Sequence, residues 1–232
     1  MVKIISDSTC DLSKDLLEKY DIDITPLHIV LGEDEYEDGV NITPDEIYKW
    51  SDENKETPKT SAAGIEQTTE MMRPYVEAAI MAQEGKNAQE IADRIEHLKP
   101  LVRSSFVVDT LTYLHRGGRC TGLAAMAGGV LKLHPKIVVE DGKMRPDKKY
   151  RGKMERVVMD YAKDIEEDLK TAKKDRVFIT HSGCSEDIID EVKNYLQTLN
   201  IFDEILVTRA GGVISSHCGP GTLGVLYIKR YE

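Results

Sequence analysis

Side chains that could bind a small anion gather in one stretch near the end of the chain. His217 stands there between Ser216 and Cys218, in a run from 211 to 224 that is rich in glycine. Imidazole and hydroxyl groups donate hydrogen bonds to carboxylates and phosphates, and glycine lets a backbone approach a ligand closely. Apolar runs on both sides predict two strands. We therefore expect a tight loop between them, which either cradles a ligand or serves only as a turn.

A pair of hydroxyls earlier in the chain is a second candidate for the same chemistry. Thr60 and Ser61 follow Pro58 and precede a helix that we predict to begin near residue 65. Hydroxyls and free backbone N–H groups at a helix N-terminus favour a carboxylate or phosphate. Simple N-capping would use the same residues, and the sequence alone leaves both interpretations open.

A third hydroxyl, that of Ser8, lies in the polar loop between a predicted strand at residues 2–5 and a predicted helix at 12–20. In a parallel α/β sheet, ligand clefts lie beyond the carboxyl ends of the strands. Ser8 is therefore a candidate cleft-lining residue, with bonding to its own loop as the equal alternative. Asp7 in the same loop is predicted to organise the loop backbone.

The elements that must position these residues change character along the chain. Alternating strands and helices predict a parallel-type α/β/α domain at residues 1–103, with capped helices that begin after Thr43 and Asn87. An Asp-Gly turn at 141–142 and returning strands predict an α+β domain with a mixed or antiparallel sheet at residues 104–232. The predicted fold class is thus a two-domain α/β protein.

Composition narrows the classes of function. The chain has 232 residues and a net charge of −10, which disfavours binding to nucleic acids and to anionic membrane surfaces. No run approaches the roughly 20 apolar residues of a membrane span, and the N-terminus does not read as a signal peptide, so we expect a cytoplasmic protein. The four cysteines are scattered without a CxxC pair, so we expect no metal site and no disulfide framework; a redox role for Cys120 or Cys218 stays open.

Four motifs carry a resemblance to a known family. The chain resembles the DegV family of bacterial fatty-acid-binding proteins. The motifs are Ile5-Ser6-Asp7-Ser8-Thr9-Cys10-Asp11-Leu12, Pro58-Lys59-Thr60-Ser61, the segment from Phe106 to Leu111 with Leu114-His115-Arg116-Gly117-Gly118-Arg119, and His217-Cys218-Gly219-Pro220-Gly221.

The resemblance implies a carrier that is not itself an enzyme. A long-chain fatty acid lies between the two domains in such proteins, with no other cofactor, and its carboxylate is held here by Thr60, Ser61 and His217. Gly219 is a further candidate for the cleft wall. A partner fatty-acid kinase then phosphorylates the carboxylate for phospholipid synthesis, and Arg151 matches a basic position for contact with that kinase.

The chain departs from the family in two places. Cys218 stands where a threonine is common. The family also has a strand, a Ser/Gly-rich loop, a helix and a further strand after the helix that follows the Thr-Ser pair. Here the helix near residues 69–77 joins directly to the helix near 79–84, so more than one βαβ unit, about 30 residues, is missing.

Two other functions remain as alternatives. In a hydrolase or acyltransferase, Cys218 or a serine would be the nucleophile and His217 the base. Adjacent residues of a strand point to opposite sides, which argues against this pair unless a turn brings them together. A shortened module that no longer binds lipid is the second alternative.

Overall fold

The computed structural model of the chain describes residues 2–60, 72–118, 133–140 and 143–230. Two small sheets come from the first sixty residues. One is a parallel pair, β1 (Ile4–Asp7) with β2 (Ile22–Thr25); in the other, β3 (His28–Leu31) lies antiparallel between β4 (Asp34–Glu37) and β5 (Lys59–Thr60). The helices of this half are η1 (Ser8–Cys10), α1 (Lys14–Tyr20), α2 (Pro44–Asn54), α4 (Met72–Gln83), α5 (Ala88–Leu98) and η2 (Lys99–Leu101).

The rest of the chain forms a six-stranded mixed sheet in the order β10-β9-β11-β6-β7-β8. The β9–β10 pair is parallel and the other neighbours are antiparallel. The strands are β6 (Val102–Val107), β7 (Leu133–Glu140), β8 (Lys143–Arg151), β9 (Arg176–Ser182), β10 (Glu204–Arg209) and β11 (Thr222–Ile228). The predicted fold class is confirmed. The division of the chain at residues 103 and 104 stays a prediction.

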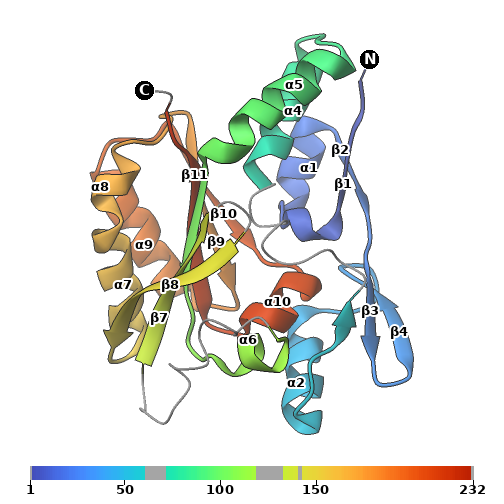
Figure 1. Cartoon of the computed structure of the whole chain (residues 1–232), viewed down its shortest axis with the longest axis vertical. Coiled ribbons are helices and arrows are strands. Elements are labelled where there is room, and N and C mark those ends of the chain that lie inside the picture. The colour runs from blue at the N-terminus through green and yellow to red at the C-terminus, as the bar shows by residue number, and fades with distance from the viewer. Residues whose placement is uncertain (1, 61–71, 119–132, 141–142, 231–232) are drawn as a thin grey trace.

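Helices cover the two faces of the large sheet differently. α7 (Met154–Asp164), α8 (Glu166–Leu169) and α9 (Glu186–Thr198) lie on one face, and the first half of the chain lies on the other (Figure 1). The core under α7 and α9 contains Tyr161, Val192 and Leu196, which pack against Ile179 and Val225 of the sheet. Two short helices, α6 (Thr112–Arg116) and α10 (Gly212–Cys218), lie between the sheet and the first half of the chain (Figure 1).

Both predicted helix caps are confirmed, and each is part of a capping box. The Thr43 side chain accepts from the N–H of Glu46, whose carboxylate accepts from the N–H of Thr43 at the start of α2. Asn87 and Glu90 make the same reciprocal pair at the start of α5. The signal is readable from sequence because both partners lie within one helical turn.

Two breaks in the chain separate neighbouring elements. Pro26 separates β2 from β3, which pair with different neighbours. Ile165, which has φ −90° and ψ 1°, separates α7 from α8. One predicted element differs in the structure. The loop predicted between 211 and 224 contains the helix α10. The predicted start of a helix near residue 65 lies outside the described residues.

Candidate functional site

The helix α10 is the centre of the candidate site, and all seven of its residues are buried. Two carboxylates from the first forty residues of the chain accept hydrogen bonds from the N–H groups at its N-terminal end. Asp11 Oδ1 lies 2.7 Å from the nitrogen of Gly211, and Asp38 Oδ1 lies 2.7 Å from the nitrogen of Gly212. Asp38 Oδ2 also accepts from the N–H of Val213 at 3.3 Å. These bonds satisfy donors that have no partner inside a helix, which explains how a glycine-rich sequence forms one here.

Ser8 belongs to this capping network. Its hydroxyl donates to Asp38 Oδ2 at 2.8 Å and accepts from the N–H of Leu27 at 3.2 Å. Asp7, as predicted, organises the loop, because its carboxylate accepts from the N–H of Thr9 and caps η1. In this structure the Ser8 hydroxyl therefore links its own loop to the carboxylate of Asp38 and to the backbone of Leu27.

Gly212 lets α10 pack closely against the first half of the chain. A Cβ atom at this position would lie 2.6 Å from Cδ1 of Ile47 and 2.9 Å from Cδ1 of Ile29. Both isoleucines are fully buried in the cluster that also contains Val213 of α10. The start of α10 is thus clamped by α2 and β3.

His217 lies at the other end of α10, where α6 supports it. The histidine is 3% exposed, and a Cβ atom on Gly117 would lie 2.7 Å from its Nδ1. Gly219, two residues further on, has φ +76°, and a Cβ atom there would lie 2.6 Å from Cδ2 of Tyr113, so only glycine fits against this ring. Arg116 of α6 donates to the backbone carbonyl of Ser51 in α2 at 3.1 Å, which ties α6 to the first half of the chain.

The structure connects the strand of Thr60 to α10 through one residue. Thr60 ends β5 and is paired with Ile29 of β3, and Ile29 packs against Val213 of α10. Ser61 lies outside the described residues. Arg151 ends β8 and is exposed, as a residue for partner contact must be. The assignment of Thr60, Ser61 and His217 to one ligand stays a prediction.

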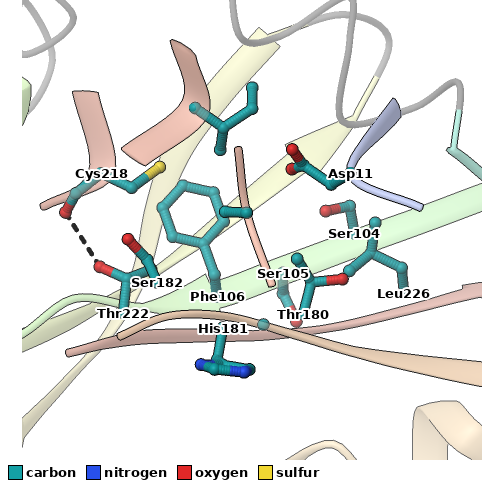
Figure 2. A pocket seen from close by; sticks show the side chains of 13 residues that line it. Asp11, Ser104, Ser105, Phe106, Thr180, His181, Ser182, Cys218, Thr222 and Leu226 are labelled. Carbon is teal, nitrogen blue, oxygen red and sulfur yellow. Dashed lines mark hydrogen bonds between the residues drawn. The ribbon is translucent and has the colours of Figure 1, made fainter. Parts of the chain in front are cut away.

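A cavity lies between α10 and the large sheet (Figure 2). Its volume is about 40 Å³. Such a cavity has room for no more than a few waters, so an acyl chain requires its walls to move apart. Its apolar walls come from Phe106, Ala210, Ile214, Cys218, Gly224 and Leu226.

The cavity follows the strand β11. Thr222 lies at one end of the cavity. Its hydroxyl donates to the carbonyl of Cys218 at 2.9 Å, and Cys218 is the residue that follows His217. Leu226 marks the other end, where it packs with Cys10 and Leu12, the two neighbours of Asp11. Four residues of strand span about 13 Å. The cavity therefore runs under the whole length of α10.

Cys218 contributes its side chain to the cavity, but its thiol is not prepared for nucleophilic attack. Burial raises its pKa to about 12, and the nearby Asp11 acts in the same direction. A reactive cysteine needs a lowered pKa, because the thiolate is the nucleophile. His217 and Cys218 are also consecutive residues of a helix, where adjacent side chains do not face each other. The geometry therefore gives no support to the hydrolase alternative at this cysteine.

Two other classes of site find no support in the part of the chain that the structure describes. Among those residues, no group of three or more His, Cys, Asp or Glu side chains could hold a metal ion. Within the same ranges, no helix is long and apolar enough to cross a membrane.

The buried carboxyl group of Asp11 makes the free energy of unfolding depend on pH. Burial raises the pKa of its carboxyl well above the usual range, with a smaller contribution from the charge of Asp38. The folded protein therefore holds this proton more tightly than the unfolded chain, so the group favours folding at acidic pH, and this stability is lost as the pH rises through the folded pKa. We expect Asp11→Asn to match or exceed the wild type in stability at about pH 8, and to lose that advantage towards about pH 4, near the unfolded pKa.

Urea unfolding at a series of pH values measures this difference. Asp15→Asn, on the exposed side of α1, is the control and should follow the wild type throughout. An Asp11→Asn variant whose stability stays parallel to that of the wild type at every pH would show that Asp11 is ionised alike in both states.

Comparison with known proteins identifies a family model and sequences that are similar to this chain. The sequence model described as "Uncharacterised protein, DegV family" matches residues 1–79 and 74–230. A DegV domain-containing protein from Caldanaerobacter subterraneus subsp. tengcongensis is 27% identical over 281 aligned positions, which cover 99% of each chain. One from Clostridium acetobutylicum is 25% identical with the same coverage.

Solved structures share the fold. A DegV family protein from Thermus thermophilus, described by its fatty-acid binding, has a TM-score of 0.84 at 24% identity and covers 98% of this chain and 99% of its own. A Streptococcus pneumoniae fatty acid kinase B3 protein, solved loaded with linoleic acid, has a TM-score of 0.78 at 14% identity, with coverage of 98% and 99%.

The comparisons also locate the missing segment. The alignment with the Caldanaerobacter relative has 281 positions, 49 more than the 232 residues of this chain, so at least that many residues of the relative face gaps. The two family matches meet at residues 74–79 within α4, which is where we expected the shortening. The gaps in this chain together therefore exceed the predicted 30 residues.

Sequence reasoning missed two residues that shape the site. Asp38 was given no role from the sequence, yet it is 3% exposed and holds α10. Ser104 was not singled out, although it is buried on the cavity wall. The partner of Asp38 lies 174 residues away, so no local pattern could have revealed it.

Proposed function

Because the chain belongs to the DegV family, we propose that it binds a long-chain fatty acid between its two halves and presents the carboxylate to a partner fatty-acid kinase. The kinase forms an acyl phosphate that enters phospholipid synthesis, and this chain acts as the carrier. One observation carries the proposal: a largely apolar cavity runs under α10, the helix that ends at His217 and Cys218.

The carboxylate is assigned to the groups around the C-terminal end of α10. His217, Thr60 and Ser61 supply an imidazole and two hydroxyls, which are short, directional donors for a carboxylate. Glycine at 117 leaves room for the imidazole ring, and Tyr113 supports the turn at Gly219. The alkyl chain enters the cavity, where each buried CH₂ group contributes about 0.8 kcal/mol.

Contact with the kinase is assigned to an exposed basic position. Arg151 ends the edge strand β8 and carries a positive charge on a chain whose net charge is −10. A guanidinium suits carboxylates and phosphates of a partner, because it presents several donors in a fixed plane.

Native mass spectrometry of the purified protein tests the carrier function. We expect an additional mass of a few hundred daltons, typical of a long-chain fatty acid, that leaves on denaturation. The denatured mass should be that of the 232-residue chain, 26.1 kDa. A protein that stays bare, and that takes up no added palmitate, would favour the alternative of a shortened module without a lipid ligand.

A further inference from the structure

The far end of the cavity contains two polar groups that an unsubstituted alkyl chain would leave without partners. Ser104 is 4% exposed, and its Oγ is buried without a hydrogen-bond partner among the described residues. Asp11 is 7% exposed and lines the same cavity. Both side chains point into the cavity from the side opposite Cys218 and Thr222 (Figure 2).

The register of the sheet places the two groups at one end. Ser104 of β6 is paired with Leu226 of β11, and Leu226 packs against the residues on either side of Asp11. Only one oxygen of Asp11 is used by the fold: Oδ1 accepts from the N–H of Gly211, and no described residue donates to Oδ2. A free carboxyl oxygen and a free hydroxyl therefore lie at the end of the cavity remote from His217.

The other hydroxyls on this wall are already engaged. Thr180 shares a hydrogen bond with Thr208, and Ser182 donates to the carbonyl of Gly219 at 2.8 Å. His181 points away from the cavity to the other face of the sheet (Figure 2). The polar character of the far end is thus specific to Asp11 and Ser104.

We propose that the acyl chain bound here carries a hydroxyl group near its middle, and that Ser104 and Asp11 recognise it. This inference rests on the proposed function. A ligand hydroxyl both donates and accepts one hydrogen bond, so it can pair with the Ser104 hydroxyl and with Oδ2 of Asp11 together. Burial raises the pKa of the Asp11 carboxyl, which favours its uncharged form beside a lipid.

The position along the acyl chain follows from the length of the cavity. The polar pair lies about 13 Å along β11 from Thr222. If the carboxylate is bound at the His217 end, the middle of a long acyl chain therefore lies beside Ser104 and Asp11. A hydroxyl group next to the carboxylate would not reach it.

Competition binding tests the assignment with three ligands: stearic acid, stearic acid hydroxylated near its middle carbon, and stearic acid hydroxylated next to the carboxylate. We expect the wild type to prefer the mid-chain hydroxy acid to stearic acid about 10-fold, which corresponds to one well-made buried hydrogen bond. The acid hydroxylated next to the carboxylate should show no such preference. Ser104→Ala removes the hydroxyl and should reduce the preference to about 3-fold or less.

Ser182→Ala is the matched control, because it deletes a hydroxyl from the same wall that is already paired, and it should keep the preference for the mid-chain hydroxy acid. Equal wild-type affinity for stearic and mid-chain hydroxystearic acid, or a preference unchanged by Ser104→Ala, would overturn the inference and leave the carrier function standing. If none of the three acids binds the wild type, both proposals are wrong.

Discussion

Replacing His217 with glutamine is expected to weaken palmitate binding about 10-fold to 150-fold. A hydrogen bond to a charged group contributes about 1.5–3 kcal/mol, and each 1.4 kcal/mol is a factor of ten in affinity. Glutamine fills part of the same buried space beside Gly117 but cannot place an imidazole donor on the carboxylate. Isothermal titration with palmitate measures the loss.

His97→Gln is the control for this variant. His97 lies on the exposed side of α5, on an element that contributes no residue to the cavity. Its affinity for palmitate should equal that of the wild type. A His217→Gln protein that is folded by circular dichroism and binds palmitate as tightly as the control would remove His217 from the carboxylate site.

Replacing Asp38 with alanine is expected to lower the free energy of unfolding by about 3 kcal/mol. The substitution leaves the N–H groups of Gly212 and Val213 and the hydroxyl of Ser8 without an acceptor in a buried place, and each such group costs about 1–3 kcal/mol. Burial raises the pKa of Asp38, so part of this cost is offset by the removal of a poorly solvated carboxylate. Urea unfolding at neutral pH measures the change.

Two further variants serve as comparisons for Asp38→Ala. Asp38→Asn keeps one acceptor oxygen and should lose less stability than the alanine variant. Asp34→Ala, an exposed position on the same hairpin, should stay within about 0.5 kcal/mol of the wild type. If Asp38→Ala is no less stable than Asp34→Ala, the carboxylate does not hold α10.

Local signals in the sequence predicted much of the fold. The caps at Thr43 and Asn87 join residues three apart, and the structure has both. The mixed sheet of the second half was readable from returning strands and the Asp-Gly turn. Such features depend on neighbours in the chain, which is why a single sequence contains them.

The helix α10 could not be predicted in the same way. Two glycines precede its valine and isoleucine, and glycine is among the poorest helix formers. Its stability comes from Asp11 and Asp38, which lie 200 and 174 residues earlier in the chain. Tertiary contacts override local propensity here, and the candidate site is built on the result.

In the candidate site, too, some residues could be found from local sequence signals and others only from the folded structure. His217 and Thr60 were found from motifs, because their residue types suggest the chemistry. The polar end of the cavity was not, since Ser104 is one serine in an ordinary strand until β11 and the loop of Asp11 are folded against it. Sequence located the proposed carboxylate end, and only the fold located the far end of the cavity.

The most direct test of the carrier account is the ¹³C spectrum of carboxyl-labelled palmitate bound to the wild type and to His217→Gln. The account predicts one bound resonance in the wild type that does not move between about pH 5 and pH 8, because donors around a carboxylate lower its pKa. The same resonance should be lost or displaced in His217→Gln. A bound signal that titrates like free palmitate, and that is identical in the two proteins, would contradict the account.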